Sequence, residues 1–171
     1  MINIETLPYR KCVGMMLFNR ENRVWIGRRI PKWDGDGSQK MWQMPQGGID
    51  EGESPIEAAL RELDEEIGTN HAELIGEYPD WLSYDLPRDL LGMALKGRYR
   101  GQTQKWFFMR YLGDDAQIRI DGENGHEIEF DQWRWAEIDE LVPLVVDFKR
   151  HVYEQLVQYV KQTIPLTLKT S

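Results

Sequence analysis

The chain has 171 residues, 41% of them hydrophobic, and a formal net charge of −8 at pH 7. This composition excludes a disordered chain and predicts a single folded domain over 1–171, while the acidic balance argues against a long nucleic-acid-binding track. No apolar run is long enough to span a membrane, and the single cysteine cannot form an internal disulfide. We therefore expect a cytoplasmic protein. The tail over 165–171 is expected to be loosely ordered.

Strand and turn signals occupy the first third of the chain. Cys12–Asn19 is an apolar run, and Val24–Arg29 follows it after a polar turn, so the two segments predict a hairpin. Trp33–Lys40 is rich in Gly, Asp and Ser and predicts a loop. Trp42–Pro45 predicts a short extended segment leading to a glycine-rich turn.

A helix with clear start and stop signals follows this turn. Ser54 is a good N-cap, Pro55 suits the first helical position, and Glu57 completes a capping box. Gly68 is the expected C-cap. Between the caps, apolar residues at helical spacing predict a buried stripe made of Ile56, Ala59, Leu60, Leu63 and Ile67.

The second half of the chain alternates between strand and helix patterns. We expect strands at Leu74–Leu86, Gln104–Leu112, Ile118–Ile120 and Asp131–Ala136. A turn or short helix begins at Ile138–Leu141, and the last helix spans Asp147–Gln162. Mixed strands with helices packed on them indicate an α/β sandwich.

Gly47–Thr69 contains eight acidic residues, and six of them surround the glycine-rich turn and one face of the predicted helix: Asp50, Glu51, Glu53, Glu62, Glu65 and Glu66. The last three are spaced by i,i+3 and i,i+4 and therefore share one face of the predicted helix. Carboxylate oxygens suit a hard cation such as Mg²⁺ or Mn²⁺. On this pattern alone, a solvated acidic face is the alternative interpretation.

The wider pattern distinguishes these alternatives. Gly47–Thr69 fits G-x5-E-x7-R-E-U-x-E-E-x-G-U, where U is apolar, at Gly47, Glu53, Arg61, Glu62, Leu63, Glu65, Glu66 and Gly68, with Thr69 as the one mild departure. This is the Nudix box, and the chain resembles the Nudix hydrolases. The resemblance implies an α-β-α sandwich with a mixed sheet, a loop–helix–loop metal site, and hydrolysis of nucleoside diphosphates linked to another moiety.

The resemblance also implies roles for the acidic residues. Glu62, Glu65 and Glu66 are the expected metal ligands and catalytic residues, and the Gly48 carbonyl is a further expected ligand. A later glutamate contributes in relatives; both Glu127 and Glu129 are candidates, and we favour Glu129 from the string E-F-D-x-W-R-W. The general base stays open between Glu129, Glu127 and a box glutamate. Glu53 and Arg61 are expected to form an ion pair that orients the cluster.

Similarity outside the box bears on the substrate. The segments PYRKCVG, WQMPQGGIDEGE, WLSYDLP, GQTQKWF, EFDQWRW and VDFKRHVYE resemble a bacterial branch that contains RNA pyrophosphohydrolases and asymmetric dinucleoside tetraphosphate hydrolases. We expect removal of pyrophosphate from triphosphorylated RNA 5′ ends, with diadenosine tetraphosphate hydrolysis as the alternative. A non-catalytic nucleotide-sensing module is the alternative of another class. We expect a monomer or weak dimer.

Residues of two kinds are candidates for substrate binding. Cations that would contact a polyphosphate are Arg10, Arg29, Lys105 and Lys149. Tyr84 and Phe148 are the candidates for stacking on a base, with a place in the core as the alternative for both. The basic run 96–100 is either a substrate-facing loop or an ordinary solvated turn.

Overall fold

The computed structural model describes residues 3–31 and 41–164. Its strands are β1 (Tyr9–Phe18), β2 (Val24–Arg29), β3 (Trp42–Gln43), β4 (Gln46–Gly48), β5 (Ala72–Glu77), β6 (Leu82–Asp85), β7 (Gly101–Tyr111) and β8 (Phe130–Ala136). The helices are α1 (Pro55–Ile67), α2 (Leu141–Leu144) and α3 (Arg150–Thr163). The expectations for Trp33–Lys40 and for the tail at 165–171 lie outside the described residues.

The described strands form one mixed sheet, in which the order β3-β2-β1-β7-β5 makes the main path. β1 runs parallel to β7 over its whole length, from Tyr9↔Gly101 to Phe18↔Arg110. β5 and β6 pair with β7, β4 pairs with β1, and β8 pairs with β2, all antiparallel. The expected hairpin is present only at its tip, at Phe18↔Val24, because the rest of β2 pairs with β8 and β3.

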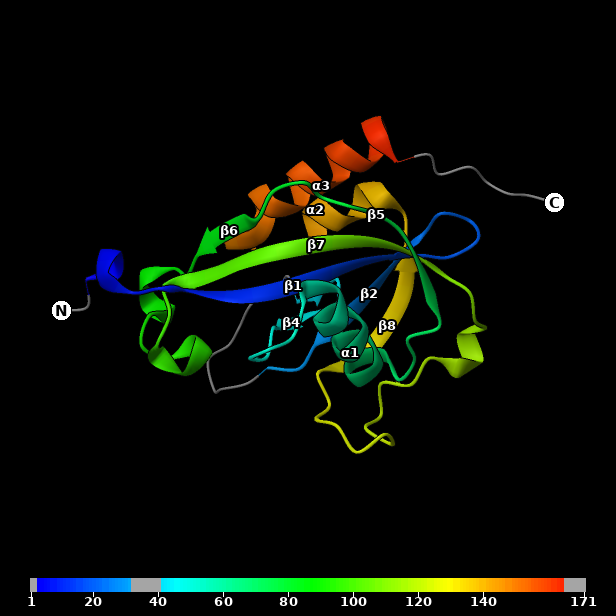
Figure 1. Cartoon of the computed structure of the whole chain (residues 1–171), viewed down its shortest axis with the longest axis horizontal. Helices are drawn as coiled ribbons and strands as arrows, with labels where there is room; N and C mark the ends of the chain where they lie inside the picture. Colours follow the sequence, from blue (N-terminus) through cyan, green and yellow to red (C-terminus); the bar gives the residue numbers. More distant parts are fainter. Residues whose placement is uncertain (1–2, 32–40, 165–171) are drawn as a thin grey trace.

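Helices cover both faces of this sheet, as Figure 1 shows: α2 and α3 lie on one side and α1 on the other. Each interface has its own core. Met16, Phe108 and Leu156 belong to the cluster under α3, and Met15, Leu63 and Met109 to the cluster under α1. Even and odd positions of β1 and β7 therefore face opposite cores, as the period of a strand requires. The predicted α-β-α sandwich is confirmed.

The ends of α1 are built as its sequence predicts. Ser54 Oγ accepts a hydrogen bond from Glu57 N, and Glu57 Oε1 accepts one from Ser54 N, both at 3.3 Å. Gly68 ends the helix in the left-handed conformation, at φ 78°. The buried side of the helix includes Leu63 and Ile67, and also Glu66, which is only 8% exposed. A carboxylate is therefore held at the boundary between core and solvent.

Three expectations about elements are wrong. Leu74–Leu86 is not one strand, because the bend at Pro79–Asp80 separates β5 from β6. Ile118–Ile120 is not a strand; Ile118 ends the 3-10 turn Asp115–Gln117, and Arg119 N donates to the carbonyl of Ile67, the last residue of α1. The last helix begins at Arg150 rather than Asp147, because Asp147–Lys149 is a separate 3-10 turn, η6.

Cys12 is fully buried in β1. Within 3–31 and 41–164, no helix combines the length and apolar character that crossing a membrane demands.

Candidate active site

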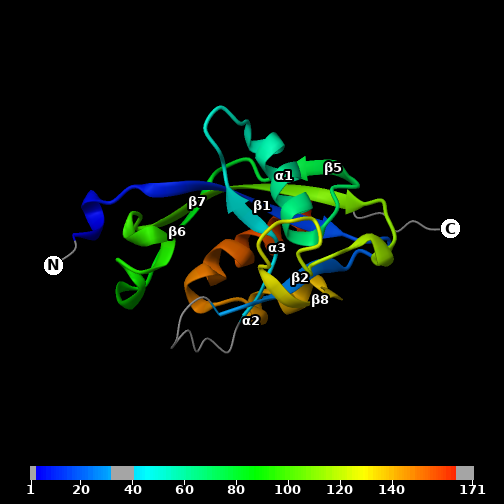
Figure 2. The same ribbon diagram turned by 90° about the horizontal axis from the view of Figure 1, so that it is seen from below.

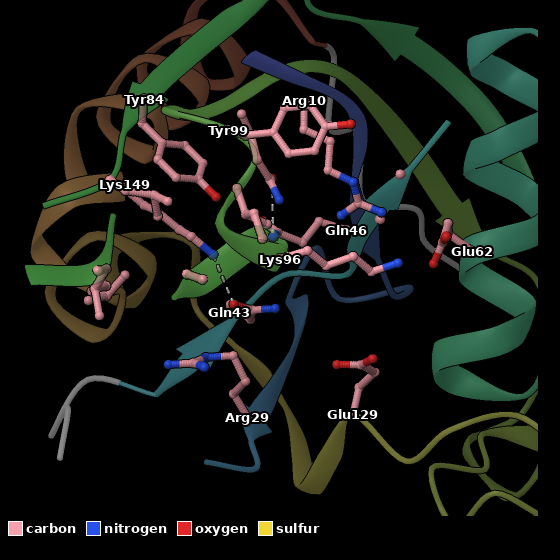
Figure 3. A pocket seen from close by; sticks show the side chains of 18 of the residues that line it. Arg10, Arg29, Gln43, Gln46, Glu62, Tyr84, Lys96, Tyr99, Glu129 and Lys149 are labelled. Carbon is pink, nitrogen blue, oxygen red and sulfur yellow. Dashed lines mark hydrogen bonds between the residues drawn. The ribbon is translucent and has the colours of Figure 1, made fainter. Parts of the chain in front are cut away.

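One cleft of about 950 Å³ collects most of the candidate residues. Residues of β1, β4, β6 and η6 line it, and α1 closes one side. Figure 2 shows this end of the sheet from below, and Figure 3 shows the labelled side chains. Glu62 lies on one side, Tyr84 and Lys149 lie opposite, and Arg10 and Gln46 lie between them. The cleft therefore has an acidic wall and a cationic, aromatic wall.

The acidic wall comes from α1 and the turn before it. Glu62, Glu65 and Glu66 all line the cleft. Glu66 Oε2 accepts a hydrogen bond from Gln46 N at 3.2 Å, which ties the helix to β4. A Cβ atom at Gly47 would lie 2.0 Å from Glu62 Cδ. Glycine at this position therefore lets the backbone approach the carboxylate closely.

Arg61 holds the acidic residues together. Its guanidinium donates to Glu53 at 2.7 and 2.9 Å, to Glu62 at 2.9 Å and to Glu65 at 3.3 Å. Its Nη2 also donates to the Gly48 carbonyl at 2.9 Å. The expected pair of Arg61 with Glu53 is therefore present, and its geometry is bidentate. One delocalised cation offsets the repulsion among several carboxylates and fixes their directions.

The environment moves the carboxyl pKa values of this cluster in opposite directions. The hydrogen bonds from Arg61 and from the Asp50 backbone lower the pKa of Glu53 to about 2. Burial raises the pKa of Glu62, and the hydrogen bond from Arg61 opposes that shift only in part. Glu53 is therefore an anion at neutral pH that holds Arg61, whereas ionised Glu62 is favoured by any further positive charge nearby.

The donor set of the acidic wall fits a hard divalent cation, since it offers carboxylate oxygens and a glycine carbonyl. The residues that would hold such an ion are Glu62, Glu65, Glu66 and the Gly48 carbonyl. In the described part of the chain, no three acidic, histidine or cysteine side chains are grouped tightly enough to bind a metal ion as they stand. Arg61 Nη1 lies against Glu62 and Glu65, so a bound cation would share these oxygens with the guanidinium.

Glu127 and Glu129 both line the cleft, from the segment that precedes β8. The Glu129 carbonyl accepts a hydrogen bond from Ile30 N at 3.0 Å, which anchors this segment to the end of β2. Figure 3 shows the Glu129 carboxylate facing the space below Glu62. Both positions suit an additional acid, and the assignment of the base to Glu129 stays a prediction.

The opposite wall brings together residues that are far apart in the sequence. Arg10, Arg29, Tyr84, Phe148 and Lys149 all line the cleft, from β1, β2, β6 and η6. The Arg10 guanidinium lies over the box turn, because a Cβ atom at Gly48 would be 2.3 Å from its Nη2. Lys149 donates to Gln43 Oε1 at 3.2 Å and lies 5.5 Å from the centre of the Tyr84 ring.

The two candidate stacking residues contact each other. The ring centres of Tyr84 and Phe148 are 5.5 Å apart, at an interplanar angle of 44°. Tyr84 is only 4% exposed, so it is a core residue that also borders the cleft. Burial raises the pKa of its hydroxyl well above the ordinary value, which keeps the phenol neutral. Phe148 is the more accessible of the pair.

Lys105 was predicted to contact the polyphosphate of the substrate, but it is not among the residues that line the cleft. Its position on β7 is odd, so its side chain projects from the sheet face opposite to Gln102 and Gln104. The ammonium donates to the Tyr78 carbonyl at 2.7 Å and pairs with Glu77 at 3.8 Å. Lys105 therefore contributes to the β5–β6 connection and lies outside the cleft.

Some residues of the cleft were left open or missed by the sequence analysis. Lys96, Arg98 and Tyr99 line it, so the basic run borders the cleft, and its role in substrate binding stays a prediction. Leu95 and Lys96 both have positive φ, at 54° and 58°, a strained conformation for residues other than glycine. Gln46 and Gln102 also line the cleft; the signal for the latter was a polar residue on the inward side of a buried strand.

Residues 8–156 of the chain match the NUDIX domain family. The chain belongs to this family. It is an enzyme that acts on pyrophosphate bonds, and enzymes of this family generally use a divalent metal ion. The box predicted from the sequence is thus confirmed as a family signature, and the interpretation as a non-catalytic sensing module is set aside.

Curated relatives match over nearly the whole NUDIX chain. An RNA pyrophosphohydrolase of Mesorhizobium japonicum is 53% identical over 159 residues, covering 91% of this chain and 92% of the relative. An RNA pyrophosphohydrolase of Brucella abortus is 54% identical over 160 residues, covering 92% and 90%. The family match over residues 8–156 spans both walls of the cleft.

Solved structures show the same fold at much lower identity. The E. coli dihydroneopterin triphosphate pyrophosphohydrolase superposes with a TM-score of 0.63 at 19% identity, covering 88% of this chain and 98% of that chain. A C. elegans Ap4A hydrolase has a TM-score of 0.59 at 16% identity, with coverages of 90% and 98%. These likenesses support the sandwich architecture alone.

Proposed function

We propose that this NUDIX protein is a Mg²⁺-dependent RNA pyrophosphohydrolase, which removes pyrophosphate from the 5′ end of triphosphorylated RNA. Water attacks the α-phosphorus, the α–β anhydride bond breaks, and a 5′-monophosphate and pyrophosphate are formed. Mn²⁺ should substitute for Mg²⁺ because the donor set consists of oxygens.

The observation that carries this proposal is the placement of two walls around one cleft. The acidic wall supplies Glu62, Glu65 and Glu66, and the opposite wall supplies Arg10, Arg29 and Lys149 together with the Tyr84–Phe148 pair. A triphosphate at the end of a nucleotide needs both, since the phosphates require cations and the base requires an aromatic surface. The 53–54% identity to the RNA pyrophosphohydrolases supports RNA as the substrate.

Each wall has a separate task in the reaction. A divalent cation, when bound, neutralises phosphate oxygens and makes water more nucleophilic. Arg61 keeps Glu62 and Glu65 directed at the cleft. Arg10 and Lys149 hold the phosphate chain, and Phe148 stacks on a base. Glu129 or Glu127 accepts the proton of the attacking water.

Hydrolysis of dinucleoside polyphosphates is the second candidate, and one feature favours it. Besides the Tyr84–Phe148 pair, the cleft is lined by a third aromatic residue, Tyr99, and by Met93, which is 58% exposed. These side chains offer an additional surface for the second nucleoside of diadenosine tetraphosphate. The same surface also suits the second nucleotide of an RNA chain.

A direct comparison separates the two substrates. Catalytic efficiency is measured on a 5′-triphosphorylated oligonucleotide and on diadenosine tetraphosphate at the same Mg²⁺ concentration, with pyrophosphate release as the readout for the RNA. We expect the RNA to be the better substrate. Rapid cleavage of the dinucleotide together with no release from RNA would reject the first proposal.

Further properties follow from the proposed activity. RNA 5′ ends are cytoplasmic substrates in bacteria, and the fully buried thiol of Cys12 suits a reducing compartment. The acidic net charge of −8 suits recognition of one chain end rather than a long RNA track. We propose a monomer or weak dimer that contacts only the first few nucleotides.

A further inference from the structure

Three neighbouring strands place a polar row on the wall of the cleft. In the register of the sheet, Gln102 lies beside Arg10 of β1 on one side and beside Tyr84 of β6 on the other. Side chains of cross-strand partners project from the same face. The Gln102 amide is therefore placed between a cation suited to phosphate and the aromatic pair suited to a base.

The orientation of the Gln102 amide depends first on the indole of Trp106, which is held in place by packing. Trp106 is fully buried, and its ring lies over Gly14, where a Cβ atom would be 2.4 Å from the ring. Tyr153 meets the indole edge to face, with ring centres 5.9 Å apart. The Tyr153 hydroxyl in turn accepts a hydrogen bond from Met44 N at 2.8 Å. The direction of the indole N–H is thus set by packing.

An indole N–H is a donor only, so it determines the orientation of the next amide. Trp106 Nε1 donates to Gln104 Oε1 at 3.0 Å. The Gln104 amide therefore turns its nitrogen the other way. This nitrogen donates to Gln102 Oε1 at 2.9 Å and to Gln46 Oε1 at 3.1 Å.

The orientation of the Gln104 amide in turn fixes the orientation of the Gln102 amide. Its oxygen accepts from Gln104 and, at 3.5 Å, from Gln46 Nε2. Its Nε2 has no hydrogen-bond partner within 3–31 and 41–164. Gln102 lines the cleft, so the group left for a ligand there is an N–H donor rather than an oxygen.

We propose that Trp106 and Gln104 are positioning residues that hold the Gln102 amide as a hydrogen-bond donor, so that the cleft selects a nucleobase by a keto oxygen at the edge that Gln102 meets. This inference rests on the proposed RNA activity. A base with an amino group at the same edge sets donor against donor and leaves both unsatisfied, which favours the keto base by about tenfold or more in KM.

The decisive variant is Gln104→Glu. Its ionised carboxylate accepts from Trp106 and has no hydrogen for Gln102, so the Gln102 amide turns over and presents its oxygen to the cleft. Triphosphorylated oligonucleotides that differ only by inosine or adenosine, placed in turn at the first and second positions, are compared at alkaline pH, where the buried carboxyl is ionised. We expect wild type to favour inosine at one position and Gln104→Glu to favour adenosine there.

Two further variants keep the test informative if Gln104→Glu does not fold. Trp106→Phe and Gln104→Met remove the donor or the relay, so each should bring the inosine-to-adenosine ratio close to one through KM, while kcat changes less. Trp135→Phe is the control, because it removes another indole donor, to Asp115 at 3.0 Å, away from the cleft. An unchanged ratio in the folded relay variants overturns the inference, whereas absence of turnover on any RNA by wild type overturns the proposed function instead.

Discussion

The two walls of the cleft are built in different ways. The acidic wall comes from one continuous stretch, Gly47–Glu66, and its internal contacts join residues on adjacent turns of α1 or at its start. The opposite wall combines β1, β2, β6 and η6, which lie up to about 140 residues apart, as with Arg10 and Lys149. Under the proposed function, chemistry is thus concentrated in a local motif, and recognition is distributed over the sheet.

The largest effect should come from breaking the acidic wall at its carboxylates. Glu62→Gln and Glu66→Gln each remove a charge without changing shape, so kcat should fall by roughly 10²–10⁴-fold at limiting Mg²⁺. Circular dichroism should show an intact fold. Asp64→Asn is the control, since it lies on the same helix but does not line the cleft. Near-normal turnover of both variants would remove these residues from the metal site.

A smaller loss of kcat is expected when Arg61, which holds the carboxylates of the acidic wall together, is changed. Arg61→Lys retains the positive charge but lacks the planar five-donor fork that contacts Glu53, Glu62 and the Gly48 carbonyl. We expect kcat to fall by roughly 10- to 100-fold, with a higher Mg²⁺ requirement. Arg134→Lys breaks a comparable bidentate pair with Glu140 outside the cleft and should leave kcat unchanged. Equal effects of the two substitutions would contradict the role of Arg61.

Changes to the opposite wall, with its cationic and aromatic residues, should affect substrate binding more than turnover. Arg10→Ala should raise KM by roughly 10- to 100-fold, in line with the 1.5–3 kcal/mol of a hydrogen bond to a charged group. Lys105→Met should alter KM by less than about twofold, because its ammonium is engaged by the Tyr78 carbonyl outside the cleft. Steady-state kinetics on the triphosphorylated oligonucleotide test both. A large effect at Lys105 would return it to the substrate site.

The smallest effect concerns stability and acid. The folded-state pKa of Glu53 is lowered to about 2 by Arg61, below its ordinary value of 4.5. The contribution of ionised Glu53 to the free energy of unfolding is therefore complete above about pH 4.5 and is lost as the pH falls towards 2. Urea unfolding without divalent metal should show a steeper loss of stability in this range for wild type than for Glu53→Gln. Parallel curves would mean that the pair adds no stability of its own.

The features that the sequence predicts correctly are local, like the acidic wall, and most of those that it predicts wrongly depend on distant residues, like the opposite wall. The caps of α1, its buried stripe and the shared face of Glu62, Glu65 and Glu66 depend on contacts three or four residues apart, which helical periodicity specifies directly. The wrong expectations concern Leu74–Leu86, Ile118–Ile120, the start of the last helix at Asp147, and Lys105. For the two segments and for Lys105, contacts with residues far along the chain decided where the strand ends or which side the side chain faces.

The sequence by itself determined the family, the acidic helix and the sandwich architecture, because a motif with fixed spacing and local hydrogen bonds leaves few alternatives. Only the tertiary structure decided which cations reach the cleft, that Lys105 does not, and that Lys96 and Gln102 do. The reason is that a shift of one residue in a strand turns its side chain to the other face, and register is set by the whole sheet. The direction of the Gln102 amide depends on one further level, the packing of Trp106 over Gly14.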